Sequence, residues 1–330
     1  MNETFISVKQ TQRKSAMYQK WLKNPVRFVA MTGYSIEQFS RLLPYFDKAH
    51  QHYFSRHDLK GKKKKELRRF VIYSNSPLPT VADRLAFILS FKKLNPIQEQ
   101  QADWFDMTQK QCNEFIHSLT MVLEDAVRDA CVMPAATAPQ LAGQLDRATG
   151  DTMLLHDATE REIPRPAEEE QQKENYSGKN KKHTLKNAVI INALCLIVFV
   201  GATVSGAVHD KKVAEQQYLP VLSDAKAKIT LWQDTGYQGF APPGVTIIQP
   251  QKKPKGKELT PTQKDRNRQI SSVRIRVEHA IGSTKRYRIV KEECRLRKNN
   301  YPYKVFALCA ALHNLRVEAK PFIYPEIKLT

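Results

Sequence analysis

An apolar stretch of 21 residues, AVIINALCLIVFVGATVSGAV at 188–208, constrains the fold more than any other part of the sequence. It is long enough to cross a membrane as a helix. However, it is rich in β-branched residues, contains Asn192 and leads into a polar segment with a glycine. These features favour two buried strands joined tightly at Asn192-Ala193, in a sheet that is covered on both faces. A membrane span is the alternative.

The hydrophobic periodicity changes once along the chain. From Ser35 to about Val132 the apolar residues recur at helical spacing, and after a small, proline-containing segment at 131–144 strands alternate with helices. The pattern predicts an all-helical domain followed by an α/β domain with helices on both sides of a mixed sheet. The predicted boundaries are a basic N-terminal arm (1–31), a helical domain (32–133), a linker (134–147), an α/β domain (148–320) and a C-terminal tail (321–330).

Within the helical domain, residues 95–123 predict a helix-turn-helix. The first helix ends at Phe105, Asp106-Met107 make a short turn, and Thr108 begins the second helix; Ala102 lies where the two must approach closely. A simple helical bundle without DNA contact is the alternative. An earlier helix at 35–46 is predicted to begin at Ser35, with Glu37 in the capping signal. The candidate DNA-binding residues of the second helix are Gln109, Lys110, Gln111 and Asn113.

The charge balance predicts a polyanionic partner. The formal net charge is +20, with 53 Lys and Arg against 33 Asp and Glu, and the cations cluster at 60–69 and 251–257. Such a field favours nucleic acid, whereas a solvated basic surface is the alternative. The five cysteines form no C-x-x-C pair, which argues against a zinc ribbon and a disulfide framework and fits a reducing cytoplasm. The N-terminus lacks the apolar core of a signal peptide.

Two predicted strands end in a carboxylate. The strand at 152–159 stops near Asp157, and the strand at 228–234 stops at Asp234. Side chains at strand ends line the crevice of an α/β sheet, so these carboxylates converge if the two strands are neighbours. Converging carboxylates repel each other unless a cation lies between them, which favours magnesium. Each could instead be a solvated turn residue.

A third carboxylate lies on a predicted helix at 267–288. Its apolar stripe should pack on the sheet, and Glu278 lies among cations on the adjacent stripe. This arrangement suits a metal ligand with neighbours that contact phosphate, although Glu278 could instead pair with Arg274 four residues earlier. The second stripe comprises Asn267, Ser271, Arg274, Glu278, Gly282 and Lys285.

The order Asp157, Asp234, Glu278 resembles the DDE triad of transposases with an RNase H-like catalytic core. The chain is similar to the IS5 superfamily of bacterial insertion-sequence transposases and to the related PIF/Harbinger group. The likeness covers about residues 32–317, including the region of the predicted helix-turn-helix. The matching stretches are YSGKNKKHTLK (176–186), GAVHD (206–210), DTGYQG (234–239) and RNRQISSVRIRVEHAIGSTKRY (266–287).

The resemblance implies a bacterial, nucleoid-associated enzyme that binds the ends of an insertion sequence, cleaves DNA strands and joins them to target DNA. Asp157, Asp234 and Glu278 would hold two Mg²⁺ ions, for which Mn²⁺ would substitute. The partners implied are double-stranded DNA and further copies of the chain, as a homodimer or higher oligomer. The alternatives are a nuclease that does not join strands, a DNA-binding relative without activity, and a regulator built on the N-terminal helices.

The resemblance also implies supporting residues. His156, His209 and Asp210 are candidate accessory residues, although Asp210 could cap the helix that begins at Lys211. Tyr176, Tyr237 and Tyr287 are candidates for stacking on a base. The candidate contacts to the DNA backbone are Lys179, Lys181, Lys182, His183, Lys186, Asn267, Arg274, Lys285 and Arg286.

Overall fold

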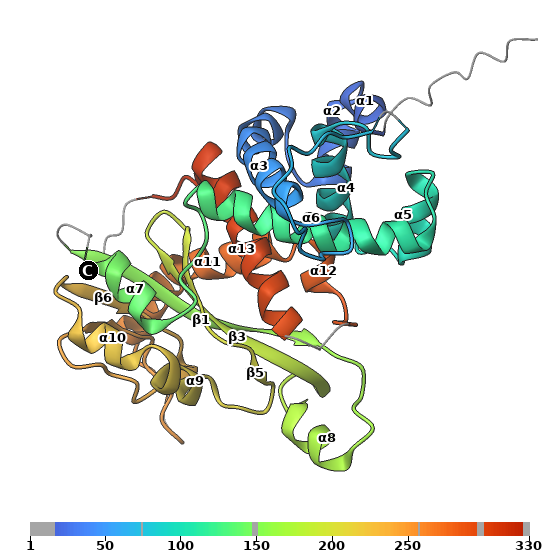
Figure 1. Cartoon of the computed structure of the whole chain (residues 1–330). Coiled ribbons are helices and arrows are strands. Elements are labelled where there is room, and N and C mark those ends of the chain that lie inside the picture. The colour runs from blue at the N-terminus through green and yellow to red at the C-terminus, as the bar shows by residue number, and fades with distance from the viewer. Residues whose placement is uncertain (1–16, 74, 147–150, 257, 296–299, 326–330) are drawn as a thin grey trace, which may run out of the picture.

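The protein combines a group of helices, built from residues 17–129, with a mixed sheet that carries helices on both faces (Figure 1). The predicted α/β class is therefore confirmed, and an all-helical segment precedes the sheet. The computed structural model describes residues 17–73, 75–146, 151–256, 258–295 and 300–325. The first 16 residues of the predicted arm lie outside this part of the chain.

The remainder of the predicted arm is helical. It forms α1 (Met17–Leu22) and α2 (Pro25–Thr32), in which Trp21 and Phe28 are buried. The side chain of Asn24 accepts a hydrogen bond from the Arg27 N–H at 3.0 Å and so caps α2. The basic composition of this segment pointed to an exposed arm, but the burial of its aromatic residues fixes it to the helical domain.

Two long helices follow, α3 (Ile36–Arg56) and α4 (Val81–Leu94). Ser35 begins α3 as predicted, but its partner in the capping box is Gln38 rather than Glu37. The Ser35 hydroxyl accepts from the Gln38 N–H at 3.2 Å, and the Gln38 side chain accepts from the Ser35 N–H at 3.0 Å. Gln38 is favoured because it is the third helical residue, which is the one that can reach back to the cap.

The predicted pair of helices at 95–123 is present as α5 (Gln98–Trp104) and α6 (Gln109–Asp129). Asp106 takes a left-handed backbone conformation (φ 52°) in the turn, and Thr108 caps α6. Ala102 is only 2% exposed, as expected of a residue between two closely packed helices. The DNA-binding role of α6 stays a prediction.

The sheet is built around two long antiparallel strands, β1 (Thr152–Glu162) and β3 (Lys182–Asn192). On the outer side of β3 lie three short antiparallel strands, and on the outer side of β1 lie two parallel strands. The former are β2 (Tyr176–Ser177), β4 (Ile197–Val200) and β5 (Val204–Ser205). The latter are β6 (Ile229–Trp232), next to β1, and β7 (Thr246–Ile248), next to β6.

The apolar stretch at 188–208 forms strands, as predicted. β3 turns into β4 at Asn192, whose side chain accepts hydrogen bonds from the N–H groups of Leu194 and Leu196 at 3.1 and 3.0 Å. Cys195 adopts φ 62° in this turn. Among the helices in the described ranges, none has the length and apolar character needed to cross a membrane.

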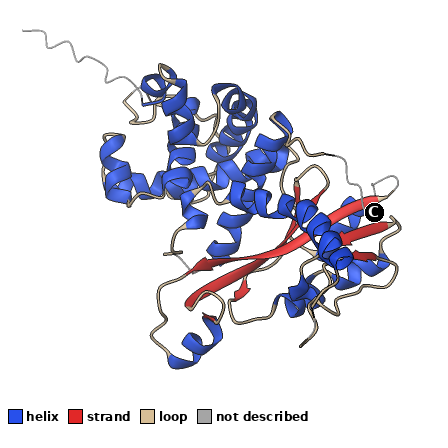
Figure 2. Cartoon of the chain, turned by 180° about the vertical axis from the view of Figure 1, so that it is seen from behind, coloured by secondary structure: helices blue, strands red, loops and turns tan. Residues whose placement is uncertain are grey.

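Helices cover both faces of the sheet, and Figure 2 shows the strands running between them. Because side chains alternate along a strand, Leu155 joins the core on one face and Leu154 joins the core on the other. The first face packs against α11 (Pro261–Thr284) and α13 (Tyr301–Ala319). The second packs against α7 (Ala138–Leu145), α9 (Asp210–Gln217) and α10 (Leu219–Asp224).

The helical domain and the α11–α13 face of the sheet share one continuous hydrophobic core. Tyr34, which follows α2, is fully buried and donates a hydrogen bond to the Leu312 carbonyl of α13 at 2.7 Å. The predicted linker is likewise structured, because Leu141 and Leu145 of α7 are buried in the core on the opposite face. Two short helices complete the fold, α8 (Glu169–Asn175) and α12 (Arg288–Lys291).

Candidate active site

The pairing of β1 with β6 positions two of the predicted carboxylates. The two strands run parallel, and their last paired residues are Leu155 and Trp232. Two residues further along each strand direction come Asp157 and Asp234. Since side chains alternate, both fall on the same face as Leu155 and Trp232, which belong to the core beneath α11. The two strands are therefore neighbours in the sheet, as the predicted convergence of the carboxylates requires.

The predicted end of the first strand is corrected. β1 does not stop at Asp157 but continues to Glu162, because β3 goes on pairing with it, and Asp157 lies opposite Val189. β6 does end, at Trp232, and Asp234 follows as the N-cap of a short 3₁₀ turn over Thr235–Tyr237. Its Oδ1 accepts from the Thr235 N–H at 2.7 Å. Asp234 thus also performs the turn role that its sequence context suggested.

Asp157 is held in an environment that disfavours its charge. The pKa of this carboxyl is raised from 3.8 to about 6, chiefly by burial and to a lesser extent by the nearby carboxylates of Asp210 and Asp234. A hydrogen bond from the Ala158 N–H, 2.8 Å from Oδ1, and the positive charge of Arg274 oppose this shift in pKa. A raised pKa next to other carboxylates is the electrostatic signature of a cation-binding or proton-transfer site.

Arg274, on α11, supplies the cation that faces these carboxylates. Its Nη1 lies 3.2 Å from Asp234 Oδ1, and the Arg274 residue is 8% exposed. The expected alternative, an ion pair between Arg274 and Glu278 on the same helix, is not formed. Arg274 Nε is buried and has no hydrogen-bond partner in the described residues, so this guanidinium is only partly satisfied.

Glu278 lies one turn beyond Arg274 on α11 and is exposed. In the part of the chain that the structure describes, its carboxylate has no hydrogen-bond or ion-pair partner. No group of three or more His, Cys, Asp or Glu side chains in those ranges is arranged to hold a metal ion. The structure therefore brings Asp157 and Asp234 together, with Arg274 against them, and leaves Glu278 apart.

Asp210 does not cap α9, as the sequence had suggested it could. The N-cap of α9 is His209, whose Nδ1 accepts from the Lys211 N–H at 3.3 Å, and Asp210 is the first helical residue. Asp210 instead pairs with Lys186 Nζ at 2.7 Å, and this ammonium also lies 3.5 Å from a carboxylate oxygen of Glu160. Lys186 is 6% exposed, so it is a buried counter-ion rather than a surface contact for DNA.

His156 lies on the opposite face of β1 from Asp157 and is fully buried. Burial lowers the pKa of His156 to about 3, so the ring is neutral. Nε2 donates to Gln233 Oε1 at 3.2 Å, and Nδ1 accepts from the Tyr218 hydroxyl at 2.6 Å. This histidine links β1 to Tyr218, which lies between α9 and α10, and it is too deeply buried to contact a phosphate. The sequence offered no signal for its partner Tyr218.

Substituting Tyr218 with Phe is expected to lower the free energy of unfolding by about 1–3 kcal/mol, because it leaves the buried Nδ1 of His156 without a donor. The DNA cleavage that the resemblance implies should stay unchanged per folded molecule. Urea unfolding of the purified protein measures the first quantity and a cleavage assay the second. Unchanged stability with reduced cleavage would mean that His156 acts in the reaction.

Several predicted DNA contacts have internal partners. On α6, the side chains of Gln109 and Asn113 bind Gln98 of α5, and Gln111 completes the cap of the helix. Asn267 holds the backbone of Gln251 through two hydrogen bonds, at 2.7 and 2.9 Å. These contacts tie neighbouring elements together.

The remaining candidates divide by exposure. Lys182 pairs with Glu162 at 2.7 Å, and the half-buried Lys285 donates to the Glu160 carbonyl at 3.0 Å. His183 packs edge-on against Tyr176, their ring centroids 5.7 Å apart. Tyr237 and Tyr287 are 1% and 2% exposed and cannot stack on a base, whereas Tyr176 is exposed. The predicted cations that face solvent without a side-chain ion pair in the described residues are Lys110, Lys179, Lys181 and Arg286.

The chain is similar to known proteins over part of its length. Residues 156–314 match the family described as DDE superfamily endonuclease, and this segment contains Asp157, Asp234 and Glu278. A probable transposase for insertion sequence element IS702, from Microchaete diplosiphon, is 29% identical over 170 residues, which are 52% of this chain and 59% of that protein. A putative transposase for insertion sequence element IS112, from Streptomyces albus G, is 30% identical over 142 residues, which are 42% of this chain and 50% of that protein.

The chain thus spans between half and three fifths of the length of these curated relatives. No solved structure matches it significantly. The family match and the two relatives agree with each other. Over residues 156–314, this chain is similar to the DDE superfamily of endonucleases.

Proposed function

We propose that the chain is a DNA transposase, which binds the ends of an insertion sequence, cleaves DNA strands there and joins them to target DNA. The observation that carries the proposal is the register of β1 and β6, because it puts Asp157 and Asp234 side by side in a domain that matches DDE endonucleases. The two insertion-sequence relatives favour transposition over another use of the same domain.

DDE endonuclease domains depend on divalent metal ions, and the donor chemistry fits such an ion. Carboxylate oxygens are the ligands that Mg²⁺ prefers, and a cation would offset the burial and the repulsion from other carboxylates that raise the pKa of Asp157. We propose that Asp157, Asp234 and Glu278 hold Mg²⁺, with Mn²⁺ as a substitute. Two bound ions would activate a water molecule or a DNA 3′-hydroxyl as the nucleophile and would stabilise the leaving oxygen.

Each residue has its own part in this proposal. The Ala158 N–H fixes the orientation of the Asp157 carboxylate. The side chain of Asp234 is 48% exposed, so it can exchange Arg274 for another cation without leaving its turn. Glu278, one turn beyond Arg274 and unpaired among the described residues, is free to turn toward the aspartates when that exchange happens.

The finer points of the proposal concern the rest of the protein. We assign α5 and α6 as a helix-turn-helix, the sheet domain as an RNase H-like core, and the family branch as IS5. The exposed cations, among them Lys110, Lys179 and Arg286, would bind the phosphate backbone as point charges. The active form would be a homodimer or higher oligomer on two element ends, in the nucleoid of a bacterial cell.

Two measurements test the proposal: the metal dependence of cleavage and the joining of the cleaved strand to target DNA. A labelled duplex that ends in the inverted repeat of the encoding element is incubated with the protein in Mg²⁺, in Mn²⁺ and in EDTA, with a target plasmid present. We expect cleavage at the element end and joined product in either metal, and neither in EDTA. Cleavage without joining would indicate a nuclease, and tight binding without cleavage in both metals would indicate a DNA-binding relative.

A further inference from the structure

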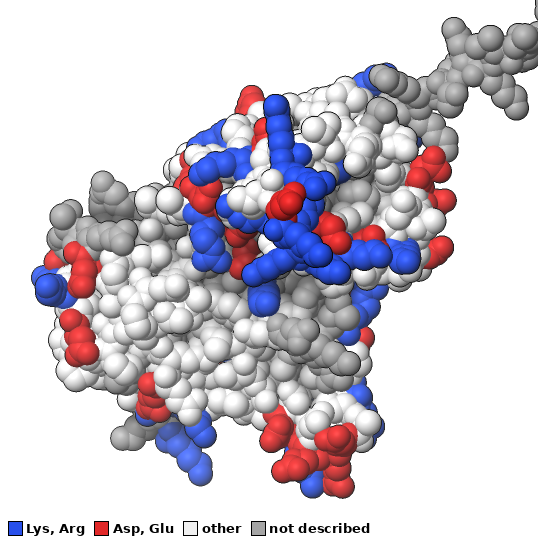
Figure 3. Space-filling model, in the orientation of Figure 1, with Lys and Arg blue, Asp and Glu red and all other residues white. Residues whose placement is uncertain are grey.

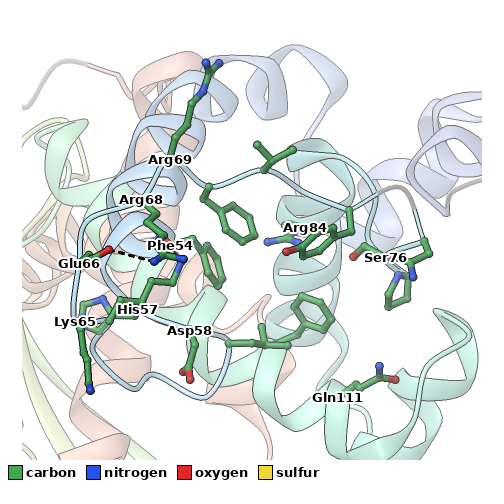
Figure 4. Close-up of a pocket in the computed structure, with 18 residues that line it drawn as sticks. Phe54, His57, Asp58, Lys65, Glu66, Arg68, Arg69, Ser76, Arg84 and Gln111 are labelled. Atoms are coloured by element: carbon green, nitrogen blue, oxygen red, sulfur yellow. Dashed lines mark hydrogen bonds and ion pairs between the residues drawn. The ribbon is translucent and has the colours of Figure 1, made fainter.

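A pocket of about 1020 Å³ lies in the helical domain and includes no residue of the sheet. It opens between the end of α3, the beginnings of α4 and α6, and the connecting segment 57–77, which we call the basic loop (Figure 4). Nothing in the proposed cleavage chemistry uses this pocket. Its lining therefore needs an explanation of its own.

The described part of the basic loop is held to α3 by hydrogen bonds. Asp58 and Lys62 pair through an N–H to carbonyl bond of 3.0 Å across a turn in which Gly61 has φ 79°. The Lys64 N–H donates to the Arg56 carbonyl at 2.7 Å, and Lys64 Nζ donates to the Phe54 carbonyl at 2.6 Å. The rim of the pocket is thus fixed to the body of the domain.

Positive charge dominates the lining. Residues 60–69 contain seven Lys or Arg and one Glu, and Figure 3 shows Lys and Arg gathered over this side of the helical domain. The acidic lining residues are Asp58 and Glu66, of which Glu66 pairs with Arg68 at 3.1 Å in a solvent-exposed contact. The basic lining residues are Lys64, Lys65, Arg68, Arg69 and Arg84.

Arg84 is a buried cation without an acidic partner in the described part of the chain. It is 4% exposed; its Nη1 lies 2.8 Å from His50 Nε2, and its Nε donates to the Leu78 carbonyl at 3.4 Å. Burial, and then the charge of Arg84, lower the pKa of His50 to about 3, so this partner is neutral. Leaving a buried charge unpaired is costly, which marks the pocket as a site for an anion.

Four aromatic residues, Phe54, Phe70, Tyr73 and Phe115, also line the pocket. The guanidinium carbon of Arg84 lies 5.3–5.5 Å from the ring centroids of Phe54, Phe70 and Phe115. At the rim, Tyr73 is 77% exposed. A ligand that matches both the cations and the rings must carry negative charge together with a flat, apolar surface. A nucleotide has both, since its sugar carries a charged phosphate and a flat base.

We propose that this pocket binds one nucleotide, with its phosphate facing the cations and its base stacked on the aromatic residues of the basic loop. The nucleotide would be an unpaired one at a DNA end. That DNA is its source rests on the proposed function. An acidic peptide would satisfy Arg84 and the lysines but would make no use of Phe70 or the exposed Tyr73. The pocket would thus help the protein to distinguish a frayed or overhanging end from continuous duplex.

Binding in EDTA tests this proposal separately from cleavage. Fluorescence anisotropy compares the full chain on a blunt duplex and on the same duplex with a three-nucleotide single-stranded overhang. We expect the overhang to be bound at least about 5-fold more tightly, since one stacked base is worth about that much or more. Tyr73→Ala should remove this preference. Tyr45→Ala, which alters a 41% exposed tyrosine of α3 outside the pocket, should retain it.

Competition identifies the ligand. If dAMP or the isolated overhang strand displaces the labelled DNA from wild type and not from Tyr73→Ala, the nucleotide assignment stands, and the stronger of the two competitors shows which source is used. Equal binding of both duplexes, equal effects of the two tyrosine variants, or displacement by polyglutamate but not by dAMP would overturn it. Because the binding assay contains no metal, a missing overhang preference would not argue against metal-dependent cleavage. Likewise, a lack of cleavage in Mg²⁺ would not argue against an overhang preference.

Discussion

Asp234→Asn is expected to reduce strand cleavage in Mg²⁺ by about 10³-fold or more while leaving binding of the element end unchanged. Asparagine keeps an oxygen to accept the Thr235 N–H, so the turn after β6 should persist. The substitution removes the charge that holds a cation, and such a cation contributes several kcal/mol to stabilising a phosphoryl-transfer transition state. Rates of cleavage and affinities for the labelled end are measured on the same protein preparations.

Asp151→Asn is the matched control. Asp151 immediately precedes β1, its side chain is 72% exposed, and it pairs loosely with Lys228 at 3.4 Å. It loses the same charge by the same chemical change, so cleavage at the wild-type rate is expected. Equal cleavage by the Asp234 variant and this control would exclude Asp234 from the reaction.

Glu278→Gln extends the same assay to the residue that the structure leaves apart. If Glu278 joins the aspartates when metal binds, the variant should lose cleavage to the same degree as Asp234→Asn. If Glu278 is only an exposed residue of α11, the variant should behave like Asp151→Asn. The second result would remove Glu278 from the site without removing the pair formed by β1 and β6.

The convergence of Asp157 and Asp234 was predictable because both follow apolar runs whose side chains must be buried in one sheet. The end of β1 was not. Residues 159–162 are all polar, yet Thr159 and Arg161 are 4% and 2% exposed. Arg161 is accommodated because its Nη2 donates to Asn187 Oδ1 of β3 at 2.7 Å and its guanidinium carbon lies 5.1 Å from the Phe306 ring centroid. Such contacts between distant segments leave no local pattern.

The cations illustrate a related limit of sequence reasoning. Composition correctly marked the chain as basic, and the helical spacing of α11 put Arg274 beside Glu278. Spacing alone could not decide that Arg274 would pair instead with Asp234, 40 residues away in the chain. Likewise, Lys186 lies in a basic stretch that resembles a DNA contact, but the fold buries it between Glu160 and Asp210. Which cations reach solvent depends on the tertiary structure.

Asp157→Asn is expected to stabilise the metal-free protein at pH 8 by about 1–3 kcal/mol. Burial raises the pKa of Asp157 from 3.8 to about 6, so the folded protein binds this proton more tightly than the unfolded chain does. The contribution of Asp157 to stability is therefore complete below about pH 4 and is lost as the pH rises through about 6. Asparagine is uncharged, keeps an acceptor for the Ala158 N–H and avoids this loss.

The pH dependence separates this mechanism from a general improvement in packing. In EDTA, the difference in unfolding free energy between Asp157→Asn and wild type should grow between pH 4 and pH 8, whereas Asp151→Asn should show no such trend because its side chain is 72% exposed. Adding Mg²⁺ at pH 8 should then raise the melting temperature of wild type more than that of the Asp157 variant, since the variant lacks one of the three proposed carboxylate ligands. A variant less stable than wild type at pH 8 would mean that the Asp157 charge is already compensated by Arg274, and that the carboxylates are satisfied without metal.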